Sequence, residues 1–143
     1  MTVSTILKHK GSDIVAMKPD ATVAEAVNCL TENRIGAVVI VDDAKAVVGI
    51  ISERDIVRLL SRHGIRALDS KLDAVMTRAV VTCTAEENIT TIMERMTRGR
   101  FRHVPVVSGN QLVGIISIGD VVKYRLQEME RQHAELRDYI MTA

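Results

Sequence analysis

The stretch Val48-Gly-Ile-Ile-Ser-Glu-Arg-Asp-Ile-Val57 occurs a second time as Val113-Gly-Ile-Ile-Ser-Ile-Gly-Asp-Val-Val122. The two copies are 65 residues apart and agree at seven of ten positions. Upstream, Arg34–Val41 aligns with Arg100–Val107 at an offset of 66, and the one-residue change falls in a predicted turn, where it is tolerated. Self-similarity over such a length indicates a duplicated supersecondary unit. The chain is therefore predicted to consist of two similar halves.

Both halves show the same order of hydrophobic patterns. Apolar residues at three- and four-residue steps predict amphipathic helices, and short continuous apolar runs predict buried strands. Thr22, in a capping box with Glu25, and Asn88 are suited to begin the first helix of each half. The expected fold is α/β (α+β), with two β-α-β-β-α repeats related by pseudo-twofold symmetry and Arg62–Asp73 as connector. The expected elements are strands Val15–Met17, Ala37–Val41 and Val47–Ile51 with helices from Val23 and over Glu53–Leu60, then strands Val80–Cys83, His103–Val107 and Leu112–Ile116 with helices from Ile89 and Ile118.

The composition indicates a folded protein with an aliphatic core. The 143 residues are 47% hydrophobic and the formal net charge is +1, which excludes long disorder. The richest apolar run, Ile35–Val41, is far shorter than the roughly 20 residues of a membrane helix. The amino terminus lacks the apolar segment of a secretory signal, so a cytoplasmic protein without membrane association is expected.

Other function classes are disfavoured by what the sequence lacks. Cys29 and Cys83 do not have the spacing of a metal or redox motif, and no nucleophile–base–orienter set is visible, so an enzyme is not expected. Only Phe101, Tyr124 and Tyr139 are aromatic, which argues against nucleic-acid binding by base stacking.

The repeated Ser-x-x-Asp, Ser52 to Asp55 and Ser117 to Asp120, stands where a strand gives way to a helix. Unpaired N–H groups at a helix start favour a phosphate, to which the Ser hydroxyl can also donate. The Asp oxygens suit the two vicinal hydroxyls of a ribose. The same residues also fit a helix capping box, and the two roles can coexist.

The Gly-Ile-Ile-Ser-x-x-Asp end of each half, with the apolar-Pro-Val-Val strand at Val104–Val107, resembles the CBS domain, named after cystathionine beta-synthase. Two in tandem resemble a CBS pair, or Bateman module. The resemblance covers about residues 5–125 and implies a stand-alone pair, with repeats at 5–65 and 73–125 and a helical extension at 126–143. It also implies binding of an adenine nucleotide (AMP first, then ADP, ATP or, in places, NAD or S-adenosylmethionine) in two clefts, without a catalytic cofactor, and dimerisation.

The resemblance further implies which residues form each cleft. Basic side chains where the second repeat's strand begins, Arg100, Arg102 and His103, would meet phosphates, and Lys10 would line the first cleft. The first cleft would contain Ser117, Gly119, Asp120, Val15, Ile35, Gly36 and Ala37. The second would contain Ser52, Arg54, Asp55, Thr77, Val81, Phe101 and Arg102.

The two clefts are not expected to be equivalent. Gly36 and Ala37 leave room for a flat base, whereas Phe101 and Arg102 are bulky at the matching places. Phe101 would either stack on a base or fill the space. The cleft at Asp120 is therefore expected to bind more tightly.

The C-terminal helix carries an apolar stripe with steps of four and three, typical of a helix that packs along its length. Two alternatives are open: the stripe packs on its own module, or it packs on a second copy across a twofold axis. The stripe consists of Val122, Leu126, Met129, His133, Leu136 and Ile140.

Two functions fit these observations. The first is a regulatory sensor, in which a bound nucleotide biases the arrangement of repeats or subunits and an unidentified partner protein reads that change. The second is a constitutive dimeric scaffold whose clefts are vestigial.

Overall fold

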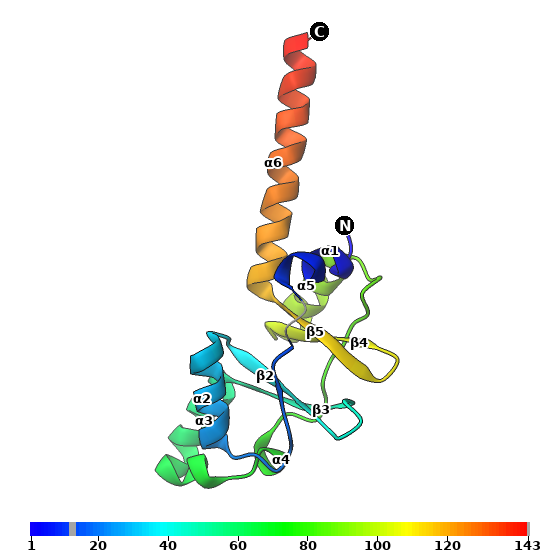
Figure 1. Cartoon of the computed structure of the whole chain (residues 1–143). Helices are drawn as coiled ribbons and strands as arrows, with labels where there is room; N and C mark the ends of the chain where they lie inside the picture. The colour runs from blue at the N-terminus through cyan, green and yellow to red at the C-terminus, as the bar shows by residue number, and fades with distance from the viewer. Residues whose placement is uncertain (12–13, 143) are drawn as a thin grey trace.

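Two small β-sheets, one from each half of the chain, form the framework of the molecule (Figure 1). The computed structural model describes residues 1–11 and 14–142. The α+β fold and the duplication predicted from the sequence are confirmed, with every predicted helix present. The elements are α1 (Val3–Lys10), β1 (Ala16–Met17), α2 (Val23–Asn33), β2 (Ala37–Val41), β3 (Val47–Ser52), α3 (Glu53–His63), the 3-10 helix η1 (Gly64–Asp69), α4 (Leu72–Val75), α5 (Ile89–Gly99), β4 (His103–Ser108), β5 (Gln111–Ser117) and α6 (Ile118–Thr142).

One predicted strand, Val80–Cys83, is wrong. Only Cys83 pairs with β4, donating to the Pro105 carbonyl (3.0 Å) and accepting from the Val107 N–H (2.8 Å). To extend this parallel ladder, residue 105 would have to donate to residue 81, and proline has no N–H. Val39 stands at the matching place in the first half, and there β1 pairs with β2 at two positions. The second sheet therefore has two strands where the first has three.

Thr22 and Asn88 are the N-caps, as predicted, but of the two bonds of the predicted Thr22–Glu25 capping box the structure gives only the one to the Thr22 hydroxyl. The Thr22 hydroxyl accepts the Glu25 backbone N–H at 3.2 Å, and the Asn88 side chain accepts the Thr90 N–H at 2.8 Å. Each bond satisfies an N–H group that the helix itself leaves unpaired.

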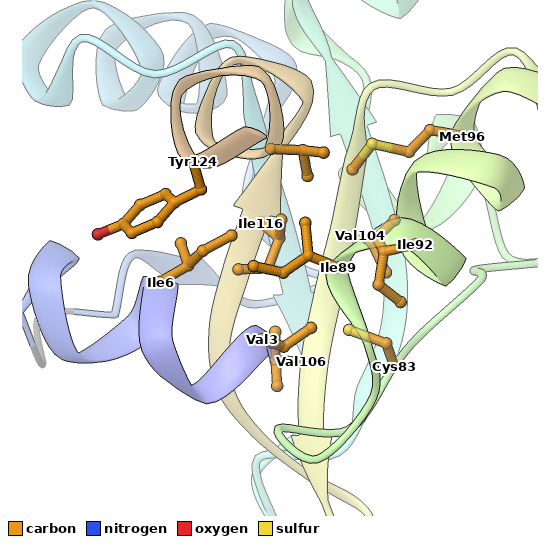
Figure 2. Close-up of a cluster of buried hydrophobic side chains, with 11 residues drawn as sticks. Val3, Ile6, Cys83, Ile89, Ile92, Met96, Val104, Val106, Ile116 and Tyr124 are labelled. Carbon is orange, nitrogen blue, oxygen red and sulfur yellow. The ribbon is translucent and has the colours of Figure 1, made fainter. Parts of the chain in front are cut away.

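Each half is completed by a helix that precedes the other half in sequence. α1, which the repeat pattern did not predict, inserts Val3 and Ile6 into the core of the second half (Figure 2). α4 inserts Leu72 into the core of the first half. The backbone bonds match: Val3 N donates to Glu87 O at 2.9 Å, and Leu72 N donates to Ala21 O at 2.8 Å.

The repeated glycine of the Gly-Ile-Ile-Ser motif belongs to this arrangement. A Cβ on Gly114 would collide with the side chain of Leu7 in α1. A Cβ on Gly49 would collide in the same way with Met76, directly after α4. At both strands, a side chain in place of glycine would force the side chain of the exchanged segment to move.

The two halves meet through a third cluster of apolar side chains. Alternate residues of β2 point to opposite sides: Val38 and Ile40 pack under α2, whereas Val39 and Val41 pack against Leu112 of β5. This two-sided burial explains why β2 is apolar at every position.

The C-terminal helix α6 extends away from the sheets (Figure 1). Val121 and Tyr124 in its first turns are buried in the second core, and the Tyr124 ring contacts the His9 ring edge-on, with centroids 5.6 Å apart. The predicted apolar stripe is exposed, so it does not pack on its own module; Leu126 and Met129 are 54% and 56% exposed. Ala143, the last residue of the predicted extension, lies outside the described residues. Among the described helices, none combines the length and hydropathy needed to cross a membrane.

Because α1 contributes directly to the second core, Ile6→Ala is expected to lower the free energy of unfolding by about 2–5 kcal/mol. Ile6 is fully buried, so the substitution leaves a cavity between α1, β5 and α6. Urea denaturation followed by circular dichroism measures the change. Lys8→Ala, at an exposed position of the same helix, serves as control and should leave the midpoint within the error of wild type. Equal effects of the two substitutions would contradict this packing.

Candidate functional site

A cavity of about 700 Å³ opens between the two halves. Its wall includes both Ser-x-x-Asp motifs and the starts of β2 and β4. This volume lies within the range of small-molecule sites. The residues predicted from the sequence that line it are Lys10, Ile35, Gly36, Ala37, Ser52, Arg54, Asp55, Thr77, Arg100, Phe101, Arg102, His103, Ser117, Gly119 and Asp120.

Both Ser-x-x-Asp motifs form complete capping boxes. Ser52 Oγ accepts the Asp55 N–H at 3.2 Å, and Asp55 Oδ2 accepts the Ser52 N–H at 2.9 Å. At the second motif, the same bonds between Ser117 and Asp120 measure 3.1 and 2.9 Å. The boxes use the Ser oxygens as acceptors, so each hydroxyl proton remains available for donation into the cavity.

The first backbone N–H of each of these helices bonds to the loop that enters the neighbouring strand. Glu53 N donates to Gly36 O at 3.0 Å, and Ile118 N donates to Arg102 O at 2.8 Å. The two bonds occupy matching places in the duplication. They hold each helix start next to the strand entrance that lines the same cavity.

Lys10, at the end of α1, reaches the second motif. Its Nζ donates to Asp120 Oδ2 at 2.8 Å and to the Ile115 carbonyl at 2.9 Å. Burial opposes ionisation of Asp120, but the hydrogen bonds from Lys10 and Ser117 outweigh it and lower the pKa of this carboxyl. Asp120 is therefore a carboxylate at neutral pH.

His103 of the second half lies beside Gly36 of the first half. A methyl group on Gly36 would be 3.3 Å from Cε1 and Nε2 of His103 and 3.1 Å from Oε1 of Glu53. The absence of a side chain at Gly36 thus makes room for the imidazole. Burial lowers the pKa of His103, opposed by the negative charge of Glu53, with smaller effects of Lys10, Asp120 and Arg102.

Arg34 and Arg100 end α2 and α5 in the left-handed region, with φ of 54° and 57°. Both line the cavity. A residue with a Cβ in this conformation costs on the order of 1 kcal/mol, and glycine is the usual occupant. Two arginines thus hold a strained conformation at matching places.

The sequence matches the CBS domain twice, over residues 3–62 and 72–127. The chain belongs to the CBS-domain family. The first match begins at α1, which packs in the core of the second domain, and the second match begins at α4, which packs in the core of the first domain.

Solved structures of CBS-domain proteins superpose on this one. The CBS-domain containing protein ATU1752 from Agrobacterium tumefaciens is 44% identical, with a TM-score of 0.83 over 87% of this chain and 99% of that protein. The CBS domain pair of protein MJ0100, solved with 5'-methylthioadenosine and S-adenosyl-L-methionine, is 25% identical, with a TM-score of 0.80 over 90% and 98%. PAE2072 from Pyrobaculum aerophilum, solved with AMP, is 29% identical, with a TM-score of 0.75 over 84% and 89%.

Two residues expected from the resemblance lie elsewhere. Val15 packs against the core of the first CBS domain, and Val81 is 41% exposed; neither is among the residues that line the cavity. Residues expected in two clefts line one continuous cavity, because the pseudo-twofold relation brings both helix starts to the same space.

Sequence reasoning missed part of the cavity wall. Arg34 is the counterpart of Arg100 at the offset of 66, so the alignment of the repeats contained a signal for it. Arg58 lies one helical turn after Asp55, with Nη1 4.0 Å from Oδ1, and Glu53 follows Ser52 directly. The missed lining residues are Arg34, Ile50, Glu53, Arg58, Ile115 and Ile118.

The lowered pKa of His103 predicts a loss of stability on mild acidification. The unfolded chain binds a proton near the ordinary histidine pKa of about 6.5, whereas the folded protein resists it. The free energy of unfolding should therefore decline as the pH falls below about 6.5. Urea denaturation at several pH values should show a smaller decline for His103→Gln. His133→Gln, at an exposed position of α6, should behave as wild type. Identical pH profiles for all three proteins would contradict the assignment.

Proposed function

We propose that this CBS pair binds an adenine nucleotide between its two domains and acts as a regulatory module rather than an enzyme. The main support is the cavity of about 700 Å³ that both Ser-x-x-Asp helix starts line. The AMP complex of PAE2072 supports the ligand class. Among the described residues, no group of three His, Cys, Asp or Glu side chains is placed to hold a metal ion.

The contacts at Ser117 and Asp120 fit a nucleoside monophosphate. Both bonds to the carboxylate, from Ser117 N and Lys10 Nζ, use Oδ2. Oδ1 is then the oxygen that accepts from a ribose hydroxyl. The Ser117 hydroxyl proton and the positive end of the α6 dipole favour the phosphate, while the Ile118 and Asp120 N–H groups are already bonded to Arg102 O and Ser117 Oγ. Capping and ligand binding are compatible, because they use different lone pairs and protons.

Charge favours a phosphate over a cationic ligand. Six basic side chains and three carboxylates line the cavity, so a sulfonium such as that of S-adenosylmethionine meets net repulsion. AMP is the simplest candidate, and ADP, ATP and NAD share its adenosine monophosphate part. The base would lie against Ile35 and Ala37, as predicted from the sequence. The space over Gly36, which was expected to hold the base as well, is occupied by His103 and Glu53.

Asp120→Asn is expected to weaken AMP binding about tenfold or more, because a neutral amide replaces a charged ribose acceptor. Asp55→Asn should have a smaller effect, since Phe101 and Arg102 crowd the matching end. Asn keeps a cap acceptor at both positions, which limits changes in stability. Isothermal titration measures the affinities. The ranking fails if Asp55→Asn abolishes AMP binding while Asp120→Asn leaves it intact.

The alternative function, a scaffold with vestigial clefts, has a separate readout. A ligand at 100 times its Kd stabilises the folded protein by about 2.7 kcal/mol. Wild-type protein should therefore melt at a higher temperature with AMP or ATP. The absence of any shift with millimolar AMP, ATP, NADH and S-adenosylmethionine would favour the scaffold.

We further propose that the protein is a homodimer in which α6 takes part. The exposed stripe is apolar at the spacing of a two-helix seam, and α6 spans about 37 Å. Such a helix cannot be covered by the CBS domain it leaves. Dimerisation would let a change at the cavity reach a second copy, and a partner protein would read that change.

Replacing the stripe residues Leu126 and Met129 together by Glu is expected to convert the dimer to a monomer, because the charges would be buried at the seam. Gln127→Glu adds a negative charge beside the stripe and should leave the mass unchanged. Light scattering after gel filtration gives the molar mass. A monomeric mass for wild type would overturn the dimer.

A further inference from the structure

The exposed part of α6 carries charged residues on both sides of its apolar stripe. The stripe repeats at steps of four and three, which places its six residues at the a and d positions of a heptad repeat. In a seam between two helices, the side chains at the flanking e and g positions set the orientation of the pair. Those positions are occupied by Lys123, Glu130 and Arg137 (e) and by Arg125, Gln132 and Tyr139 (g).

A parallel, in-register pair of α6 helices brings opposite charges together. In this arrangement each g position lies beside the e position five residues later in the second copy. Arg125 then lies beside Glu130 of the second copy, and the symmetry gives this pair twice. Gln132 lies beside Arg137, so no like charges meet. The polar stripe residue His133 lies opposite its own counterpart rather than opposite an apolar side chain.

An antiparallel pair that covers the whole stripe brings like charges together. Leu126 then lies opposite Leu136 of the second copy, and each e position lies beside another e position. This arrangement places Lys123 beside Arg137 of the second copy and Glu130 beside its own counterpart. Like charges so placed weaken the pair and disfavour this orientation.

Antiparallel registers shifted by one heptad remove the repulsion, because Glu130 then lies beside Lys123 or Arg137. They leave two of the six stripe residues of each copy uncovered, and burial of apolar surface is the main source of stability in such a seam. The parallel register is thus the one that covers the whole stripe and also joins opposite charges.

We infer that α6 pairs in parallel and in register with α6 of a second copy, and that Arg125 of each copy binds Glu130 of the other. The inference rests on the proposed homodimer and specifies its geometry. Because α6 extends away from the sheets (Figure 1), both CBS pairs then lie at one end of the paired helices. The two C-terminal ends lie together at the other end.

An exchange of the two charges tests the pairing. Arg125→Glu and Glu130→Arg should each raise the dimer Kd about tenfold, because two attractive contacts become two repulsive ones. The double variant, with both substitutions, should return the Kd to within threefold of wild type. Sedimentation equilibrium measures these constants.

The recovery in the double variant is specific to a contact between copies. Within one helix, Arg125 lies 3.7 Å from Glu128, whereas residues five apart, such as 125 and 130, do not face each other. Arg131→Glu is the matched control, because it makes the same charge change at an exposed position away from the stripe. It should leave the Kd within threefold of wild type.

Disulfide crosslinking gives an independent measure of the orientation. In the parallel register, Leu126→Cys lies opposite its own counterpart and should form a disulfide-linked dimer on mild oxidation. In the antiparallel register that covers the stripe, the two positions are ten residues apart, about 15 Å along the helix, which is too far for a disulfide. Gln127→Cys, beside the stripe on the outer face, should not crosslink. Wild type, which contains Cys29 and Cys83, gives the background.

The outcomes separate this geometry from the other proposals. If wild type is dimeric but the double variant shows no recovery, or Leu126→Cys does not crosslink, the parallel pairing is overturned and the homodimer stands. A monomeric wild type overturns both. Nucleotide binding is measured separately by titration with AMP, so each of these results leaves that proposal standing.

Discussion

The structure depends on a reciprocal exchange of segments between the two CBS domains. α1 completes the second core, and α4, which follows the first domain, completes that domain's core. The core of each half includes a helix that stands in sequence just before the other half. Neither half could therefore complete its core from its own stretch of sequence alone. The exchanged segments therefore contact both walls of the cavity. Lys10 of α1 donates to Asp120 on one wall, and Thr77, just after α4, pairs with Ile50 on the other.

The repeated motif serves several physical purposes within a few residues. Its glycine accommodates the exchanged segment, its isoleucine at 51 or 116 is buried in a core, and its Ser and Asp cap the next helix. Capping fixes the positions of the groups that the proposed ligand would use, before any ligand arrives. A binding site built from helix caps costs the fold little, because the same hydrogen bonds stabilise the helices.

Local patterns in the sequence carried most of the fold. Continuous apolar runs located β2 and β4, and the repeat located both Ser-x-x-Asp helix starts. What was missed depends on contacts distant in sequence or on backbone angles. Val3 and Ile6 have meaning only against the second core. Lys10 was expected at the cleft of Asp120, but its hydrogen bond to that carboxylate joins the first and last helices and was not. The loss of a strand before Cys83 follows from one missing N–H, that of Pro105. The alignment of the repeats showed the proline, but only the pairing register shows that residue 81 would have been its partner.

α6 begins at the cavity and ends far from it. Asp120 lies in its first turn, and Thr142 is its last residue. The first turns of the helix are buried in the second core, and the rest of its length is exposed to solvent. A rotation of about 5° at Ser117 displaces the far end by about 3 Å, given a helix of about 37 Å. In the proposed regulatory function, a small rotation at the cavity would therefore become a displacement of several ångströms at the exposed end of α6.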